Sequence, residues 1–548
     1  MTPWLLGLAL LGCNGDEPSD RPPASETGDS GVVACDDLSW DNTGQPFVAT
    51  WCTACHSSQL AEGERFGAPV GLDLDTYAGV LAHAALVESS ALGDEARMPP
   101  VGGGTADEKA RFGEWLACGL PGAPDDGDLP CAEAVVASWG PSTCADGAPV
   151  VIEGDVLASG DDGSCVCEVT GSLTVRSGDG DWGRLETLGG DLRVDGGPLS
   201  APALRGAGLV EVLSAGGGAV DLSRLQEADA VRVDGSDVVS LDLHDLRTVT
   251  GDVSVSGNPG LAYLDLSRLE TVGGSVVIED NDAVPAVLGG LYGLRSVGGD
   301  LLLVGNASWL GLYACGQLET VGGDLRVSDN PRFVALDGFT ALTRVGGTVS
   351  IVSNGGLGGL DGFDQLTDIG GDLIVSGNPV LVREDAFALL ERVEGQVVLS
   401  GNPGLEELSG LGGMEDVGGI VVNDMRGLTS LGGFPNLTRL RGGLTVQGTG
   451  VGGVDGFDGI EEIDGSLVFE ANSSLQAIVG FDGLRSVGGA VELRNHSQLW
   501  NASGLLGITS VGSDLELVDN PQLSEAGLQG WLDAVEVAGA VELSGNAP

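Results

Sequence analysis

The residues with the clearest chemistry stand together at positions 52–56, which read Cys-Thr-Ala-Cys-His. Two cysteines separated by two residues and followed at once by histidine form the attachment signature of c-type haem. Each thiol can add across one vinyl group of the porphyrin, and the adjacent imidazole then lies under the iron. The same five residues could instead hold zinc or act as a redox dithiol, but no second ligand pair stands at zinc-finger spacing.

A second candidate iron ligand is Met98, which is followed by Pro99 and Pro100. A thioether is a soft, weak ligand, and paired histidine and methionine ligands raise the reduction potential of iron. The two prolines fix φ, so they form a stiff extended loop that can hold Met98 over the haem face. The residues leave two alternatives open: Met98 as an ordinary core methionine, and His83 as the second ligand in place of Met98.

A helix is expected next, beginning at Thr105 with a capping-box pattern and ending at Cys118, where Gly119 follows as the C-cap glycine. Phe112 and Trp115 lie on one face of this helix at helical spacing. The elements that would position the haem ligands are therefore a short loop and a helix that carries aromatic residues.

The order CxxCH, then Met-Pro-Pro, then a tryptophan-bearing helix resembles class I cytochrome c domains. The resemblance implies that Cys52 and Cys55 carry one covalent haem c, with His56 as the proximal ligand and Met98 as the distal ligand. It also implies that Trp115 packs against an N-terminal helix that holds the CxxCH. Because a filled coordination sphere leaves no open site for oxygen or peroxide, we expect an electron carrier and not an enzyme.

The N-terminus indicates export, because a short apolar run ends in Leu-Leu-Gly-Cys13 and is too short to span a bilayer. This sequence resembles the bacterial lipobox, although no Lys or Arg precedes the apolar run. The resemblance implies that Cys13 is lipidated and tethers the chain to a membrane surface without spanning it. Since haem is attached to CxxCH outside the bacterial cytoplasm, we expect a cell-envelope location, in the periplasm or on the outer-membrane surface.

The remaining cysteines leave their pairing open. Cys35 and Cys118 bracket the haem segment, and a bridge between them would join its ends. Cys315 is the odd one and is expected to be a buried thiol that behaves as a small hydrophobe. Four others can pair in three ways, and sequence does not choose among them. These four are Cys131, Cys144, Cys165 and Cys167.

From about residue 165 the chain repeats one phrase, Val-Gly-Gly-Asp-Leu-x-Val-x-Gly-Asn-Pro-x-Leu. The asparagine of this phrase recurs mostly every 23 to 26 residues, and we call each such position a mark of the repeat. In the one long gap, between Asn423 and Asn472, Thr449 stands where a mark is expected. A period in the twenties is typical of a solenoid, and leucine-rich repeats fall in this range. The marks are Asn258, Asn281, Asn306, Asn330, Asn354, Asn378, Asn402, Asn423, Asn472, Asn495, Asn520 and Asn546.

The phrase predicts the shape of one coil. Asp-Leu-x-Val alternates, so it is expected to be a short strand with Leu and Val facing inward. The Gly-Gly before it is expected to turn a corner with positive φ, and Gly-Asn-Pro to form a turn. Stacked asparagines can hydrogen-bond from coil to coil. Roughly sixteen coils at ~4.8 Å each would share one core in a rod of ~75 Å.

The Gly-Gly-Asp-Leu-x-Val and Gly-Asn-Pro phrases resemble the receptor L-domain, a right-handed β-helix related to leucine-rich repeats. The resemblance implies a role in binding or display, with a protein or a glycan as ligand. The less regular early turns, with Cys165 and Cys167, are expected to form an N-terminal cap. Residues 524–535 break the repeat and are expected to be helical, whereas His244 and His496 are expected in solvated loops.

Composition excludes several function classes. The formal charge is −56 and Lys109 is the only lysine, so the chain should repel nucleic acid and anionic membrane surfaces. The charge fits a solvated surface that keeps an exposed rod soluble and unaggregated, and the alternative is cation binding or steering of a basic redox partner. No EF-hand loop, phosphate-binding Gly-rich loop or nucleophile-elbow motif is present in the sequence.

These observations predict a multidomain chain: a small all-α cytochrome c domain followed by a long right-handed β-solenoid of ~24-residue repeats. The expected function is one-electron transfer at the cell envelope with an unidentified redox partner. The alternative is a surface recognition or adhesion lipoprotein in which the solenoid carries the function. The expected segments are a signal at 1–13, a disordered linker at 14–39, the haem domain at 40–120, a Cys-rich linker and cap at 121–170, and the solenoid at 171–548.

Overall fold

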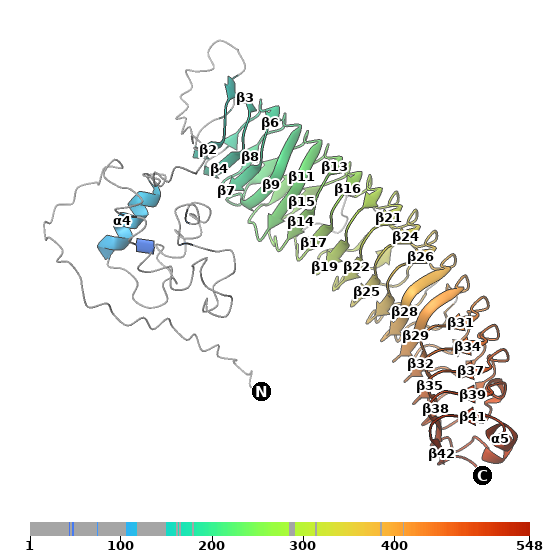
Figure 1. Ribbon diagram of the computed structural model, residues 1–548. Coiled ribbons are helices and arrows are strands. Elements are labelled where there is room, and N and C mark those ends of the chain that lie inside the picture. Colours follow the sequence, from blue (N-terminus) through green and yellow to red (C-terminus); the bar gives the residue numbers. More distant parts are fainter. Residues whose placement is uncertain are drawn as a thin grey trace. The chain divides into compact units, whose positions relative to one another are not determined.

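The computed structural model divides the chain into two units, residues 1–131 and residues 132–548 (Figure 1). In the first unit it describes residues 43, 47, 48, 74, 80 and 106–117, and in the second residues 150–548 without 160–162, 164–165, 178–179, 284–290, 313–314, 384–385 and 409. The expected helix of the first unit is present as α4 (Ala106–Ala117).

The second unit is a β-solenoid of about 14 turns, with repeats of about 24 residues from about residue 199 to 544. Its strands pair in parallel, and each coil lies against the coil before it (Figure 1). Parallel ladders already join strands within residues 150–177, in the segment expected to form the cap.

The widest sheet takes one strand from each coil. In most of its strands Leu, Val or Ile face inward and are buried, as the Asp-Leu-x-Val alternation predicts. Its strands are β2 (Val156–Ser159), β4 (Leu173–Ser177), β7 (Leu192–Asp195), β9 (Gly206–Ser214), β11 (Glu227–Asp234), β14 (Val253–Ser256), β17 (Val276–Glu279), β19 (Leu301–Val304), β22 (Leu325–Ser328), β25 (Val349–Val352), β27 (Leu373–Ser376), β28 (Arg392–Ser400), β29 (Asp416–Asn423), β32 (Leu444–Gln447), β35 (Leu467–Glu470), β38 (Val491–Arg494), β40 (Leu515–Val518) and β42 (Val541–Ser544).

A second row of short strands precedes the Gly-Gly corners. It consists of β13 (Thr248–Val249), β16 (Thr271–Val272), β18 (Ser296–Val297), β21 (Thr320–Val321), β24 (Arg344–Val345), β26 (Asp368–Ile369), β31 (Arg439–Leu440), β34 (Glu462–Ile463), β37 (Ser486–Val487), β39 (Ser510–Val511) and β41 (Glu536–Val537). Because successive members pair in register, equivalent residues of neighbouring coils lie side by side.

The second row continues towards the N-terminus in a ladder of β1 (Val150–Ile152), β3 (Val166–Val169) and β6 (Thr187–Leu188). Shorter ladders complete the remaining side of the coils. They are β5 (Gly180–Asp181), β8 (Leu199–Ser200), β10 (Ala219–Asp221), β12 (Ser240–Asp242) and β15 (Tyr263–Asp265); β20 (Gly311–Leu312) and β23 (Ala335–Leu336); and β30 (Ser430–Leu431), β33 (Gly453–Val454) and β36 (Ala477–Ile478). The 3-10 turn η4 (Ser503–Leu505) and helix α5 (Glu525–Leu532) lie near the C-terminus.

One continuous hydrophobic cluster fills the solenoid from Ile152 to Trp531. Phenylalanines of successive coils stack within it, with ring centroids 5.3 Å apart for Phe339 and Phe363 and 5.1 Å apart for Phe363 and Phe387. A single coil could not bury these rings, so the stack is a property of neighbouring coils and not of the repeat alone.

The expected column of stacked amides is present and buried. In Asn354, for example, Nδ2 donates to the carbonyl of Val327 at 2.8 Å, and Oδ1 accepts from the backbone N–H of Asn330 at 3.3 Å. Each such amide therefore satisfies two backbone groups of the preceding coil, which would otherwise be buried without partners.

Two of the expected marks are wrong. Asn495 has a positive φ of 64°, and the fully buried His496 occupies the column instead. His496 Nδ1 accepts from the N–H of Asn472 at 3.2 Å, and Nε2 donates to the carbonyl of Phe469 at 3.0 Å. The imidazole thus performs both roles of an amide, so the expectation of a solvated His496 is corrected.

The other wrong mark is Asn423, which ends strand β29 and lies outside the column. Met425 occupies the column position in that coil and is fully buried. Its thioether cannot replace the paired donor and acceptor of an amide, so the ladder is interrupted there.

The Gly-Gly corners have a different physical basis from the one expected. None of the corner glycines from Gly273 to Gly347 has a positive φ. Instead, a Cβ at Gly298 would lie 2.1 Å from the carbonyl oxygen of Gly273, and one at Gly322 would lie 2.1 Å from that of Gly298. Glycine is required because the coils approach too closely for a side chain.

Positive φ occurs at the residue before each column position, from Gly235 to Gly545. Several of these residues are not glycine, among them Asp280, Asp329 and Asp519. Aspartate adopts this conformation more readily than most residues. The Gly of Gly-Asn-Pro is therefore the residue whose conformational freedom makes the turn.

Candidate functional sites

The sequence-predicted haem and lipid residues lie outside the described residues: Cys13, Cys52, Cys55, His56 and Met98. The same holds for His83 and for five of the cysteines whose pairing was left open. Cys167 is partly buried in β3, and Cys315 is fully buried, as expected for a small hydrophobe. Burial raises the pKa of the Cys315 thiol to about 12, which makes it unreactive at neutral pH.

The described part of the first unit is an aromatic cluster around α4. Phe112 and Trp115 are fully buried, and their ring centroids lie 5.5 Å apart. Phe47, which is helical and lies just before the CxxCH in sequence, stacks on Phe112 with a centroid distance of 4.1 Å. Phe47, which precedes the CxxCH in sequence, therefore packs on the aromatic face of α4.

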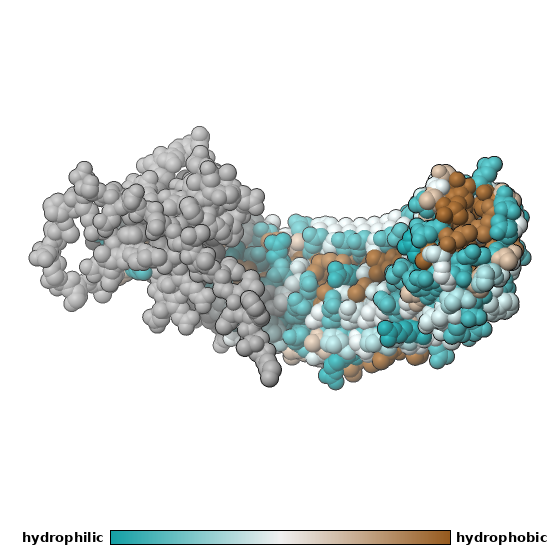
Figure 2. Space-filling view, turned by 90° about the horizontal axis from the view of Figure 1, so that it is seen from below, coloured by the Kyte–Doolittle hydropathy of each residue, from teal (hydrophilic) through white to brown (hydrophobic). Residues whose placement is uncertain are grey.

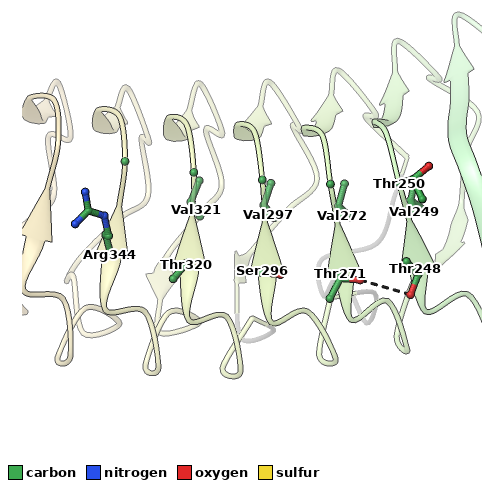
Figure 3. A pocket seen from close by; sticks show the side chains of 14 residues that line it. Thr248, Val249, Thr250, Thr271, Val272, Ser296, Val297, Thr320, Val321 and Arg344 are labelled. Atoms are coloured by element: carbon green, nitrogen blue, oxygen red, sulfur yellow. Dashed lines mark hydrogen bonds between the residues drawn. The ribbon is translucent and has the colours of Figure 1, made fainter.

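On the solenoid, a groove runs along the row of short strands and has a volume of about 890 Å³. Hydroxyl side chains at equivalent positions of four successive coils line it: Thr248, Thr271, Ser296 and Thr320. Figure 3 shows these side chains on β13, β16, β18 and β21, with Arg344 of β24 at one end. Thr250 adds a second hydroxyl from the first of these coils. This volume lies within the range of small-molecule binding sites.

The floor of the groove is apolar and without bulk. Val272, Val297 and Val321 are almost completely buried, and each precedes a corner glycine that also lines the groove. Because close coil stacking excludes side chains at these corners, nothing rises from that side to fill the groove. The close approach of the coils, which requires glycine at the corners, therefore also leaves the groove open.

The charges beside the groove are paired. Arg247 and Glu270, which precede Thr248 and Thr271, form an ion pair at 2.5 Å. At the far end Arg344 lies 3.2 Å from Asp368 of the next coil. No carboxylate lines this groove, whereas Glu227 and Asp229 line its neighbour towards the N-terminus, and Glu462 and Glu536 line one further along the row.

A cluster of His244, Asp265 and Ser267 contains the residue types of a hydrolase triad but not its geometry. His244 Nδ1 lies 3.3 Å from Asp265 Oδ2 and 3.2 Å from Ser267 Oγ, so both partners share one ring nitrogen. A relay needs the serine and the carboxylate on opposite nitrogens. Burial opposes ionisation of Asp265, but hydrogen bonds from Ser267, Tyr263 and His244 outweigh it and hold the pKa of Asp265 below its usual value.

The carboxylates of Asp221, Asp242 and Asp265 stack in register in this region. Burial raises the pKa of Asp242, and its two like-charged neighbours raise it further. Among the described residues no group of three or more His, Cys, Asp or Glu side chains could hold a metal ion. No helix in the described part of the chain is long and apolar enough to cross a membrane.

Neither the family models nor the curated proteins searched contain a match to this chain. What the geometry defines is a long β-solenoid with a hydroxyl-lined groove. Sequence reasoning missed this groove, although its signal was present as Thr or Ser before Val in four consecutive coils, with Gly after the Val in three of them.

Proposed function

We propose that this chain is an exported monohaem c-type cytochrome that transfers single electrons at the cell envelope and uses its solenoid for binding or display. The observation that supports it best is the set of ligands within residues 52–98: thiols at Cys52 and Cys55, the imidazole of His56 and the thioether of Met98. Thioether bonds and histidine–methionine ligation need these four groups.

The packing around α4 fits this proposal. The resemblance to class I cytochrome c implies that a helix near the CxxCH packs against the tryptophan-bearing helix, and the stack of Phe47 on Phe112 is a contact of this kind. When bound, haem c supplies one-electron transfer. Cys52 and Cys55 would hold the haem through thioether bonds, and His56 and Met98 would bind its iron.

A pyridine haemochrome assay on denatured protein tests the attachment, using chain exported from a host with cytochrome c maturation machinery. The full chain should retain haem through denaturation, because two thioether bonds hold it. The double change Cys52→Ser, Cys55→Ser should abolish this retention, and Cys315→Ser, at a buried cysteine of the solenoid, should not. Equal haem retention in all three proteins would contradict the proposal.

A second candidate is a surface recognition or adhesion protein, and the groove on the short strands favours it. In that case the solenoid carries the function and haem is secondary. Deleting residues 40–120 would leave surface binding intact under this candidate. Under the first candidate, His56→Ala would abolish electron transfer and leave the far-ultraviolet spectrum of the solenoid unchanged.

A further inference from the structure

We propose that the groove lined by Thr248, Thr271, Ser296 and Thr320 binds a neutral linear glycan that runs along the solenoid axis. This inference rests on the proposed function only in treating the solenoid as the binding part of the chain. Three features of the groove support it: the hydroxyl row, the floor without protruding side chains and the local charge.

The hydroxyl row provides hydrogen-bonding groups that match a sugar. Each hydroxyl supplies one donor and two acceptor sites, the same set that a sugar hydroxyl presents. Thr271 Oγ1 lies 3.5 Å from Thr248 Oγ1, which is a weak hydrogen bond (Figure 3). These side chains therefore keep most of their capacity for a ligand.

The floor lets a ligand lie close to the sheet. Val272, Val297 and Val321 are only 1–2% exposed, so their side chains belong to the core, and the corner glycines present backbone without side chains. Because nothing rises from this floor, the hydroxyls of a ligand can reach the row.

The local charge selects a neutral ligand. The chain carries a formal charge of −56, so its field disfavours an anionic polymer. A cationic ligand would be drawn to the grooves lined by carboxylates, such as the one with Glu462 and Glu536. The hydroxyl groove carries no carboxylate, and its single cation, Arg344, is paired with Asp368.

The spacing favours a polymer over a single sugar. In-register pairing of β13, β16, β18 and β21 repeats the same environment once per coil, about every 4.8 Å. A chain with repeated hydroxyls can make equivalent contacts at successive coils, and linked weak contacts add to a useful affinity.

Affinity electrophoresis of the full chain tests this inference. Native gels would contain a panel of soluble neutral linear glucans, both α- and β-linked, and a parallel set would contain polygalacturonate as an anionic probe. We expect retardation by at least one neutral glucan and none by polygalacturonate. Thr271→Val and Ser296→Ala should each weaken the retardation several-fold, and together at least tenfold.

The matched control is Ser486→Ala with Ser510→Ala, which removes hydroxyls from the same strand row in the groove that Glu462 and Glu536 line. These changes should leave retardation unchanged. No retardation by any neutral glucan, or equal weakening by the control variant, would overturn the glycan site. Haem content is measured separately on the same preparation, so the loss of one activity does not imply the loss of the other.

Discussion

The guanidinium Nη1 of Arg441 lies 3.3 Å from Glu394 Oε2, which belongs to a coil two turns earlier. The same guanidinium lies 3.1 Å from Asp416 of the coil between them. The amide ladder is interrupted at Met425 of this region, and Leu411 stands between the two phenylalanine stacks. Arg441 therefore joins three coils where two internal columns are broken.

Arg441→Gln should loosen this region. The hydrogen bond and charge of Arg441 lower the pKa of Glu394, so the pair contributes stability that is lost as the pH falls through that lowered value. We expect a lower urea midpoint than in the parent protein, with the difference shrinking at high salt because both groups are partly exposed. Arg383→Gln, at an ion pair of 3.8 Å in an adjoining coil, should have a smaller effect. If the difference in urea midpoint between Arg441→Gln and the parent protein did not change with salt, the stabilising role of the Arg441 ion pairs would be contradicted.

The amide ladder makes a sharper prediction. Asn354→Ala leaves the carbonyl of Val327 and the N–H of Asn330 without their buried partners, which should cost about 2–4 kcal/mol. Asn423→Ala should change stability much less, because Asn423 is outside the ladder and its buried Oδ1 has no hydrogen-bond partner within the described residues. Urea denaturation gives the free energy of unfolding of both variants. Similar losses of stability in Asn354→Ala and Asn423→Ala would contradict the assignment of Asn354 to the ladder.

His496 should make the solenoid sensitive to acid. Its burial lowers the pKa below the ordinary value of 6.5, since the ring must stay neutral for Nδ1 to accept from Asn472. The unfolded chain then binds more protons, so stability should be full above about pH 6.5 and fall below it. His496→Asn should reduce this fall between about pH 7 and 5. Thermal melts of the parent chain and of His496→Asn across this range measure the difference, and an equal fall in both proteins would contradict this role of His496.

The corner glycines should tolerate no side chain. Gly322→Ala would place a Cβ 2.1 Å from the carbonyl oxygen of Gly298, so we expect a loss of about 1–3 kcal/mol or more from overpacking. Gly530→Ala in α5 has nothing within 4 Å of its added Cβ and should be neutral or slightly stabilising. Thermal unfolding followed by circular dichroism measures both. A well-tolerated Gly322→Ala would mean that the coils stack less tightly than these contacts require.

The period, the inward Leu and Val, and the stacked amides could all be predicted from the sequence, because each depends on residue type at a fixed spacing. Helix α5 was also predictable, and Ser524 Oγ accepts from the N–H of Gly527 at its start. The reason for Gly-Gly was not predictable, because it lies in the distance between coils. A positive φ and a forbidden Cβ both select glycine, so the sequence alone does not separate them.

The column errors have a similar cause. Asn495 and His496 are adjacent, and both can hydrogen-bond, so only the three-dimensional register shows which one enters the ladder. Met425 occupies the column position of its coil, and Asn423, two residues earlier, has the residue type expected there. The groove could not be predicted because Thr and Ser before Val are ordinary residues of a strand. Only the in-register stacking of the coils brings these hydroxyls together along one groove.

The open C-terminal end of the described solenoid shows what stacking contributes. Val541 and Leu543 occupy inward positions of β42 but are 52% and 37% exposed, and Figure 2 shows a hydrophobic patch at this end. The equivalent Leu515 and Leu517 of β40, one coil earlier, are fully buried. Burial of a coil therefore depends on the next coil, as expected for a solenoid.

The most direct test of the proposed function is a reduced-minus-oxidised visible spectrum of the full exported chain. We predict a covalently held, low-spin, six-coordinate haem whose iron is reduced and reoxidised reversibly, and which loses its distal ligand in Met98→Ala. A correctly exported chain without covalent haem would contradict the proposed function, and the solenoid would then stand as the functional part.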